Sequence, residues 1–117
     1  MMRVTYICHR FRDDQATNVT RVRDICAALK HECVPLAPHL LLPWYLDEAT
    51  ERDLALQHCV RLVATADEVR VYGPVSEGMT LEIAEAHRLG ISVIYVDAAN
   101  ESSPRATGGR SVGVKRC

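Results

Sequence analysis

The sequence has no long hydrophobic run, no closely spaced cysteine pair and almost no net charge. Its formal net charge is −1 over 117 residues. No apolar run reaches the ~18 residues that span a bilayer, and the first residues lack the hydrophobic region of a secretory signal. We therefore expect a cytoplasmic protein with no membrane partner. Because the charges balance, the chain also lacks the basic surface of a general nucleic-acid binder, so we expect no nucleic-acid partner.

The cysteines of the chain are odd in number and widely spaced. None of them forms a C-x-x-C pair, which argues against both a disulfide framework and a zinc site. We therefore expect reduced thiols, no metal and no cofactor. The positions concerned are Cys8, Cys26, Cys33, Cys59 and Cys117.

Composition divides the chain into a folded domain and a basic tail. Hydrophobic residues make up 48% of the sequence, which is enough to build the core of a single domain. The end of the chain is rich in Ser, Gly and Arg without periodicity, and from Asn100 onward it carries four basic residues and one acidic residue. We predict a domain over residues 1–98 and a tail over residues 99–117.

Short apolar runs alternate with amphipathic stretches along the domain. The runs predict strands over residues 3–8, 34–37, 69–72 and 91–96, with helices over about 19–30, 48–65 and 78–89 between them. This order predicts a three-layer α/β fold with a parallel sheet. The last strand is continuously apolar, so we expect it to be central.

The residues between these elements add local detail. Residues 39–45 are expected to form a packed loop because Pro43 interrupts them. Asp47 is expected to cap the second helix, with Leu54, Cys59, Leu62 and Val63 facing inward. Ser76 is expected to cap the third helix, and Gly90 to end it.

Ligands of parallel α/β sheets bind beyond the carboxyl ends of strands, where the winding direction reverses. In the strand order 2-1-3-4, the loops 8–17 and 73–78 would be neighbours there. Gly73 and Gly78 allow a tight turn and a close backbone approach, and the helix start offers free N–H groups to an anion. On a helical wheel Met79, Ile83, Ala86 and Gly90 face inward, Glu85 points away, and Glu82 lies on the shoulder beside the loop.

Each of these polar residues has a structural and a functional interpretation. The Glu82 carboxylate is either a solvated shoulder residue or one half of a salt bridge in the structural interpretation. In the functional interpretation it is a nucleophile or base, since burying it is costly without partners or a task. Arg12 is either a solvated arginine or a phosphate ligand. Tyr6 is ordinarily a core residue. His39 and Trp44 form either a base-stacking wall or a small hydrophobic core.

Three segments of the chain resemble the nucleoside 2-deoxyribosyltransferase-like superfamily, and most closely a small, uncharacterised bacterial and phage branch of it. The segments are YICHRFR from Tyr6, APHLLLPWYLD from Ala37 and ADEVRVYGPVSEGMTLEIAEA from Ala66. The resemblance covers residues 3–97. It implies a flavodoxin-like or Rossmann-like three-layer sandwich with four to five parallel strands, and a homodimer or larger homo-oligomer.

The resemblance also implies an activity. Characterised members cleave the N-glycosidic bond of 2′-deoxynucleosides or their 5′-monophosphates through a covalent ester on a glutamate. By motif position that glutamate is Glu82, and Tyr6 would steer it. Arg12 and the backbone at Ser76–Gly78 would hold the 5′-phosphate or the sugar. No metal or redox cofactor is implied. The full set of expected substrate-binding residues is Cys8, His9, Arg12, Gly73, Ser76, Gly78 and Met79.

Two departures from the family pattern leave a second function open. Active members carry an aspartate on the helix before the third strand, and here that position is Cys59, whose thiol cannot replace a carboxylate. The glycine-rich first loop of phosphate-binding members is replaced by His9, Arg10 and Asp13. Asp47 or Glu48 could supply the missing acid. The alternative function is therefore the sensing or sequestering of a nucleotide-derived ligand in the same pocket without turnover.

Overall fold

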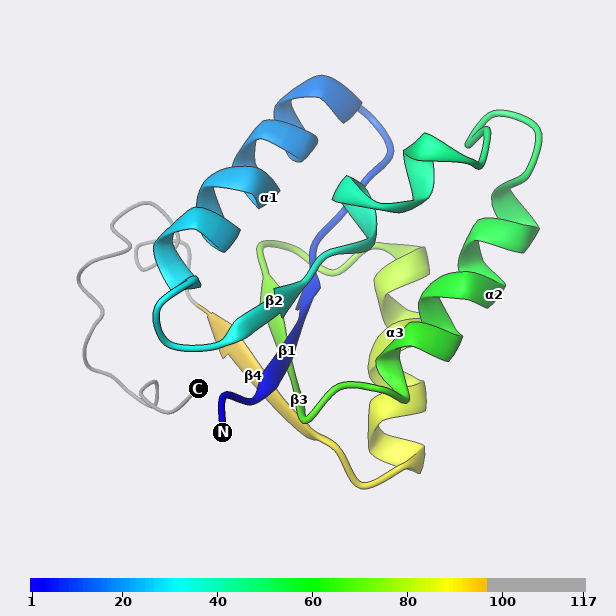
Figure 1. Ribbon diagram of the computed structural model, residues 1–117. Helices are drawn as coiled ribbons and strands as arrows, with labels where there is room; N and C mark the ends of the chain where they lie inside the picture. The colour runs from blue at the N-terminus through cyan, green and yellow to red at the C-terminus, as the bar shows by residue number, and fades with distance from the viewer. Residues whose placement is uncertain (97–117) are drawn as a thin grey trace.

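Four parallel strands form one sheet, in the order β2-β1-β3-β4, in the computed structural model of the chain (Figure 1). The structure describes residues 1–96, so the predicted domain limit at residue 98 and the predicted tail lie outside the described residues. The strands are β1 (Val4–Cys8), β2 (Val34–Leu36), β3 (Glu68–Tyr72) and β4 (Ser92–Val96). The helices are α1 (Gln15–Leu29), α2 (Arg52–Val63) and α3 (Glu77–Arg88). This is the expected flavodoxin-like or Rossmann-like α/β fold.

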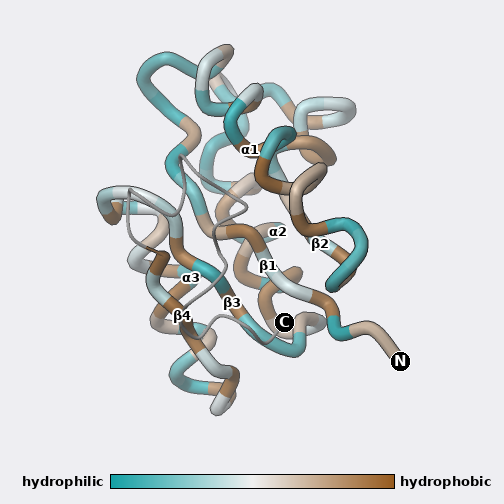
Figure 2. The backbone as a smooth tube through the Cα atoms, turned by 90° about the vertical axis from the view of Figure 1, so that its left-hand side faces the viewer, coloured by the Kyte–Doolittle hydropathy of each residue, from teal (hydrophilic) through white to brown (hydrophobic). Residues whose placement is uncertain are grey.

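Helices cover both faces of the sheet. Figure 1 shows α1 on one face and α2 with α3 on the other. Alternate strand residues face opposite sides, so Tyr6 packs with Val63 and Ile83 beneath α2 and α3, while Ile7 packs with Val22 beneath α1. In Figure 2 the strands carry the hydrophobic stretches and the connecting loops are mostly hydrophilic. No helix within residues 1–96 is long and apolar enough to cross a membrane.

The pairing of β1 with β3 brings together the two loops that the sequence pattern singled out. Cys8, the last residue of β1, lies opposite Val71, near the end of β3. The chain winds from β1 to β2 in one direction and from β3 to β4 in the other, so the reversal point lies between β1 and β3. The predicted neighbourhood of the two loops is therefore confirmed.

The prediction that the last strand is central is wrong. Within the described residues β4 is the last strand of the sheet and pairs with β3. Tyr95 is 60% exposed, whereas all five residues of β3 are buried. The apolar run of β4 arises because both of its faces still meet a hydrophobic cluster, with Val93 against the α2–α3 side and Val96 against the α1 side.

The second helix begins later than predicted, at Arg52 instead of residue 48. Asp47 caps no helix: its carbonyl oxygen accepts from the N–H groups of Thr50 and Glu51, and its side chain accepts from Ala49, so it closes a separate turn. The inward position predicted for Leu54 is also wrong, since this residue is 39% exposed. It precedes Cys59 by five residues, about 140° around the helix.

Residues 38–44, where a packed loop was predicted, form two short 3-10 helices. The first is η1 (Pro38–Leu40) and the second is η2 (Leu42–Trp44), each with a proline in its opening turn. Proline is well suited to such a position because its missing N–H group would have no helical partner. This segment crosses from the end of β2 toward α2 and forms one wall of the site described below.

Candidate active site

A cavity of about 980 Å³ lies at the carboxyl ends of β1 and β3. Its walls come from the loop after β1, from the 3-10 segment, and from the first turns of α2 and α3. The volume falls in the range of small-molecule binding sites. The position is the one that the strand order predicts for a ligand of this fold.

Glu82 reaches this cavity from α3 and is held there by side chains of other elements. The hydroxyl of Tyr6 donates to Oε2 at 3.1 Å, and the thiol of Cys8 donates to Oε1 at 3.1 Å. Cys59 on α2 forms a further hydrogen bond to the carboxyl group. Glu82 is only 8% exposed, which rules out the interpretation as a solvated shoulder residue.

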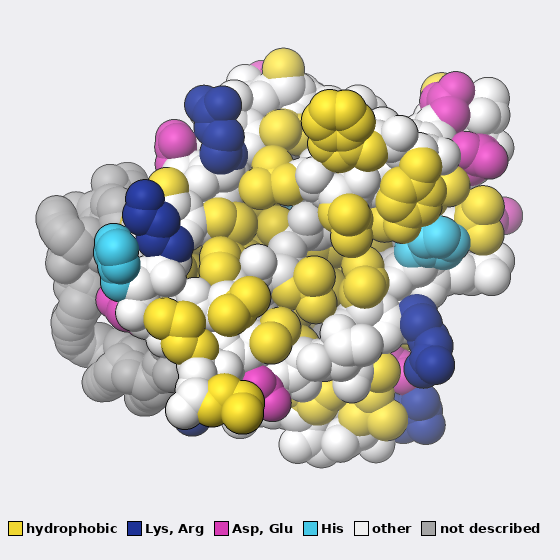
Figure 3. All heavy atoms as spheres, in the orientation of Figure 1, with side chains coloured by type: hydrophobic (Ala, Val, Ile, Leu, Met, Phe, Trp, Pro, Cys, Tyr) yellow, Lys and Arg dark blue, Asp and Glu magenta, His cyan; other side chains and the backbone are white. Residues whose placement is uncertain are grey.

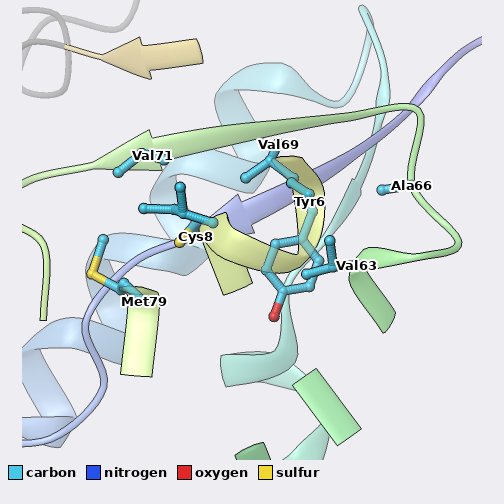
Figure 4. Packing of buried hydrophobic residues seen from close by; sticks show 9 residues of the cluster. Tyr6, Cys8, Val63, Ala66, Val69, Val71 and Met79 are labelled. Carbon is cyan, nitrogen blue, oxygen red and sulfur yellow. The ribbon is translucent and has the colours of Figure 1, made fainter. Parts of the chain in front are cut away.

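The local sequence explains this convergence. Tyr6 and Cys8 are two residues apart on β1, so both point to the α2–α3 face of the sheet. Figure 4 shows Tyr6 beside Val63 with its hydroxyl oxygen pointing away from β1. On α3, Ser76 caps the helix by accepting a hydrogen bond from the Met79 N–H, as predicted.

The electrostatics of the cluster raise the pKa of the Glu82 carboxyl group and of the donors around it. Burial raises the pKa of Glu82, and the hydrogen bonds from Cys8, Tyr6 and Cys59 partly oppose this rise. Burial, followed by the charge of Glu82, raises the pKa of Cys59 to about 12 and the pKa of Tyr6 well above its ordinary value. The thiol and the hydroxyl therefore stay protonated, and the carboxylate is poorly hydrated and unusually basic.

Two arginines and a glutamate lie at another part of the cavity wall. Glu48 Oε2 lies 2.8 Å from Nη1 of Arg52 and 3.6 Å from Nε of Arg12. Arg52 is a residue that sequence reasoning missed. The spacing of four between Glu48 and Arg52 is the available signal, but it is also that of an ordinary surface ion pair on a helix.

The base-stacking wall suggested for His39 and Trp44 is not assembled. Trp44 is 86% exposed and does not line the cavity, whereas His39 is buried in its wall. His39 Nε2 donates to the carbonyl oxygen of Arg10 at 2.9 Å, and its ring lies edge-on to Phe11 at 5.2 Å. Burial lowers the pKa of His39 to about 4, so its ring is neutral near pH 7.

The expected site residues fall into two groups in the structure. Tyr6 and Cys8 are fully buried behind Glu82 and reach the cavity only through it. Gly73 does not line the cavity; it forms the turn after β3 with φ 76°. The expected residues that do line it are His9, Arg12, Ser76, Gly78, Met79 and Glu82.

The loop after β1 makes its turn without a glycine. Asp13 adopts φ 66°, a left-handed conformation that Asp tolerates better than most side chains. Its carboxylate also pairs with Arg10 at 3.1 Å.

Asp47 and Glu48, the alternative acids, both line the cavity. Within residues 1–96 no group of three or more His, Cys, Asp or Glu side chains is arranged to hold a metal ion.

Comparison with known proteins gives a family but no activity. A family model described as a domain of unknown function (DUF7768) matches residues 3–96. No curated protein matches the chain. The resemblance to the nucleoside 2-deoxyribosyltransferase-like superfamily therefore rests on the sequence motifs alone.

Proposed function

The chain belongs to this family of unknown function, DUF7768, and we propose that it cleaves the N-glycosidic bond of a 2′-deoxynucleoside or its 5′-monophosphate, or transfers the deoxyribosyl group to another base. Glu82 is the nucleophile. The observation that carries the proposal is the buried Glu82 carboxylate, which faces a cavity of about 980 Å³ while Tyr6 and Cys8 donate to its two oxygens.

The surroundings of Glu82 suit a nucleophile. Burial is the larger effect and raises the pKa of Glu82, while three donors around the carboxyl group stabilise the ionised form that attacks the sugar. Burial makes that ionised form more basic, and a more basic carboxylate attacks carbon more readily. The donors also leave the carboxylate little freedom to rotate away from the reacting carbon.

The proposed reaction has two steps. One Glu82 oxygen bonds to C1′ of the sugar as the bond from C1′ to the base breaks. The bonding electrons go to the base nitrogen, which takes a proton from water. A water molecule, or a second base in a transfer reaction, then attacks C1′ and frees the Glu82 carboxylate. The attacking group gives a proton to the solvent, which replaces the proton taken by the first base. Both steps pass through a C1′ centre with positive character, which the nearby carboxylate stabilises.

The test is release of free base, measured by chromatography, from the common 2′-deoxynucleosides and their 5′-monophosphates. Glu82→Gln keeps the size of the side chain and should lower release by on the order of 10³-fold or more. Glu85→Gln is the matched control, because Glu85 is on the same helix but pairs with Arg88 away from the cavity. Equal release by wild type and Glu82→Gln would contradict the proposal.

A second candidate function is binding without turnover, and Cys59 is the observation that favours it. Its thiol contacts Glu82 at the position where the resemblance implies an aspartate. Cys59→Asp would supply the acid, and Cys59→Asn is the uncharged control of similar shape. If wild type binds a 5′-monophosphate without releasing base, and only Cys59→Asp releases it, the protein is a binding module.

We also propose that two copies of the chain associate and that the protein is cytoplasmic. Figure 3 shows hydrophobic side chains gathered on the face that carries β2, the 3-10 segment and α2. The exposed residues of that region include Leu41, Trp44 and Tyr45. Patches of this kind often mark protein interfaces. Light scattering after gel filtration tests the association, which Trp44→Ser should weaken.

A further inference from the structure

One carboxylate oxygen joins two arginines in the wall of the cavity. Oε2 of Glu48 contacts Nη1 of Arg52 at 2.8 Å and Nε of Arg12 at 3.6 Å. The Glu48 side chain is 18% exposed, while that of Arg12 is 60% exposed. The three side chains together carry one excess positive charge. The wall thus holds two guanidinium groups that share a single anion of the protein itself.

Arg52 also extends to the start of α3. Its Nη2 atom lies 3.5 Å from the position that a Cβ would take on Gly78. A Cβ at residue 78 would be tight only against Leu56, which lies 3.3 Å from the same position, and would make ordinary contact with the guanidinium group. Arg52 therefore lies beside the backbone in the first turn of α3.

The distance from this point to Glu82 suits a phosphorylated sugar. Glu82 follows Gly78 by four positions, which is about 6 Å along the helix axis. We place an anion between Arg52 and the start of α3, and a sugar carbon beside Glu82. These two places are separated by roughly the length of one sugar unit. The cavity runs continuously between them, since its lining includes both Arg52 and Glu82.

We infer that Glu48 occupies the place of a substrate 5′-phosphate, and that Arg52 makes the site selective for 2′-deoxynucleoside 5′-monophosphates over nucleosides. The inference rests on the proposed function. A phosphate monoester carries more negative charge than a carboxylate and offers three acceptor oxygens. The planar fork of a guanidinium group binds such oxygens in pairs. A phosphate therefore displaces Glu48 from Arg52, and Arg12 completes its contacts from the exposed side.

This arrangement gives Glu48 and Arg52 opposite effects on phosphate binding. Removing the charge of Glu48 frees both arginines, so Glu48→Gln should strengthen binding of the monophosphate. Removing the guanidinium group in Arg52→Met should weaken it. Both changes should affect binding of the unphosphorylated nucleoside much less, because the nucleoside brings no charge to these two side chains.

The experiment is calorimetric titration of the full chain carrying Glu82→Gln, which prevents turnover. Each 2′-deoxynucleoside is compared with its own 5′-monophosphate. We expect the monophosphate to bind about tenfold tighter or more, Arg52→Met to remove most of that difference, and Glu48→Gln to increase it about threefold. Arg61→Met and Glu85→Gln are the matched controls, because both residues lie outside the cavity lining.

The remaining outcomes separate the two proposals. If nucleoside and monophosphate bind equally and Arg52→Met changes neither, the inference about Glu48 and Arg52 is overturned while the proposed function stands. If neither compound binds and wild type releases no base, both are overturned. Circular dichroism of each variant excludes loss of fold, and Arg52→Lys, which keeps the charge, should retain part of the preference for the monophosphate.

Discussion

Tyr6 on β1 donates a hydrogen bond of 3.1 Å to Glu82 on α3, and this contact ties the centre of the sheet to the proposed nucleophile. The two residues are 76 positions apart in the chain. Tyr6 is fully buried and packs in the same cluster as Val63, so its hydroxyl group has no access to solvent. The position of the carboxylate is therefore set by the core of the fold.

Tyr6→Phe should weaken catalysis and shift its pH dependence. Loss of a hydrogen bond to a charged group costs about 1.5–3 kcal/mol, so kcat/KM should fall about 10- to 100-fold. The pKa of Glu82 rises when the donor is lost, so the acidic limb of the kcat/KM profile should move to higher pH. Tyr45→Phe, which loses a surface contact with His58, is the control. An unmoved acidic limb would show that Tyr6 has only a packing role.

Glu82 should destabilise the folded protein at neutral pH. Its folded-state pKa is raised above the ordinary value of 4.5, mainly by burial. The stability it contributes is therefore complete below pH 4.5 and is lost as the pH rises through the folded-state pKa. Glu82→Gln should gain free energy of unfolding relative to wild type as the pH increases from about 4.5 to 8, as measured by urea titration at each pH. A difference that does not change with pH would contradict this.

His39 should lower the free energy of unfolding as the pH falls, whereas Glu82 lowers it as the pH rises. Burial lowers its pKa from 6.5 to about 4 in the folded state. The folded protein therefore resists protonation that the unfolded chain accepts, and stability falls as the pH drops from 6.5 toward 4, by up to about 3 kcal/mol. His39→Gln should flatten this fall. NMR titration of the His39 ring should give a midpoint near pH 4, and a midpoint near 6.5 would refute the prediction.

The order of strands and helices was predictable because hydrophobic periodicity directly reflects which faces are covered. The runs at residues 3–8 and 69–72, the cap at Ser76 and the stop at Gly90, which has φ 71°, correspond to the structure within a residue or two. The position of β4 at the end of the sheet formed by residues 1–96 was not predictable in this way, because a strand between two hydrophobic clusters has the same composition as a central strand.

The candidate site was only partly predictable, because its contacts join distant parts of the chain. Glu82 could be selected from its place on α3 and from the motif around it. The contacts of Cys8 and Cys59 with Glu82 depend on how β1 and α2 pack together. No local sequence pattern encodes this packing. Arg52 was missed because its spacing from Glu48 is typical of a solvated helix pair, and only the fold turns it toward the cavity.

The buried thiols should be unreactive in the folded protein. Burial raises the pKa of Cys8 above its ordinary value and that of Cys59 to about 12, so almost no thiolate forms near pH 7. Iodoacetamide should modify Cys8 and Cys59 only after denaturation, as peptide mass spectrometry would show. Modification of either thiol in the folded protein at the rate seen in urea would mean that burial does not keep these thiols protonated.

The most direct test of the account is to trap the covalent intermediate. A 2′-deoxynucleoside 5′-monophosphate with fluorine at C2′ slows the second step, so the sugar phosphate should remain attached to the enzyme. Intact mass spectrometry should show the added mass in wild type, peptide mapping should place it on Glu82, and Glu82→Gln should show none. An unmodified wild-type protein that still releases base, or an adduct on another residue, would contradict the assignment of Glu82 as the nucleophile.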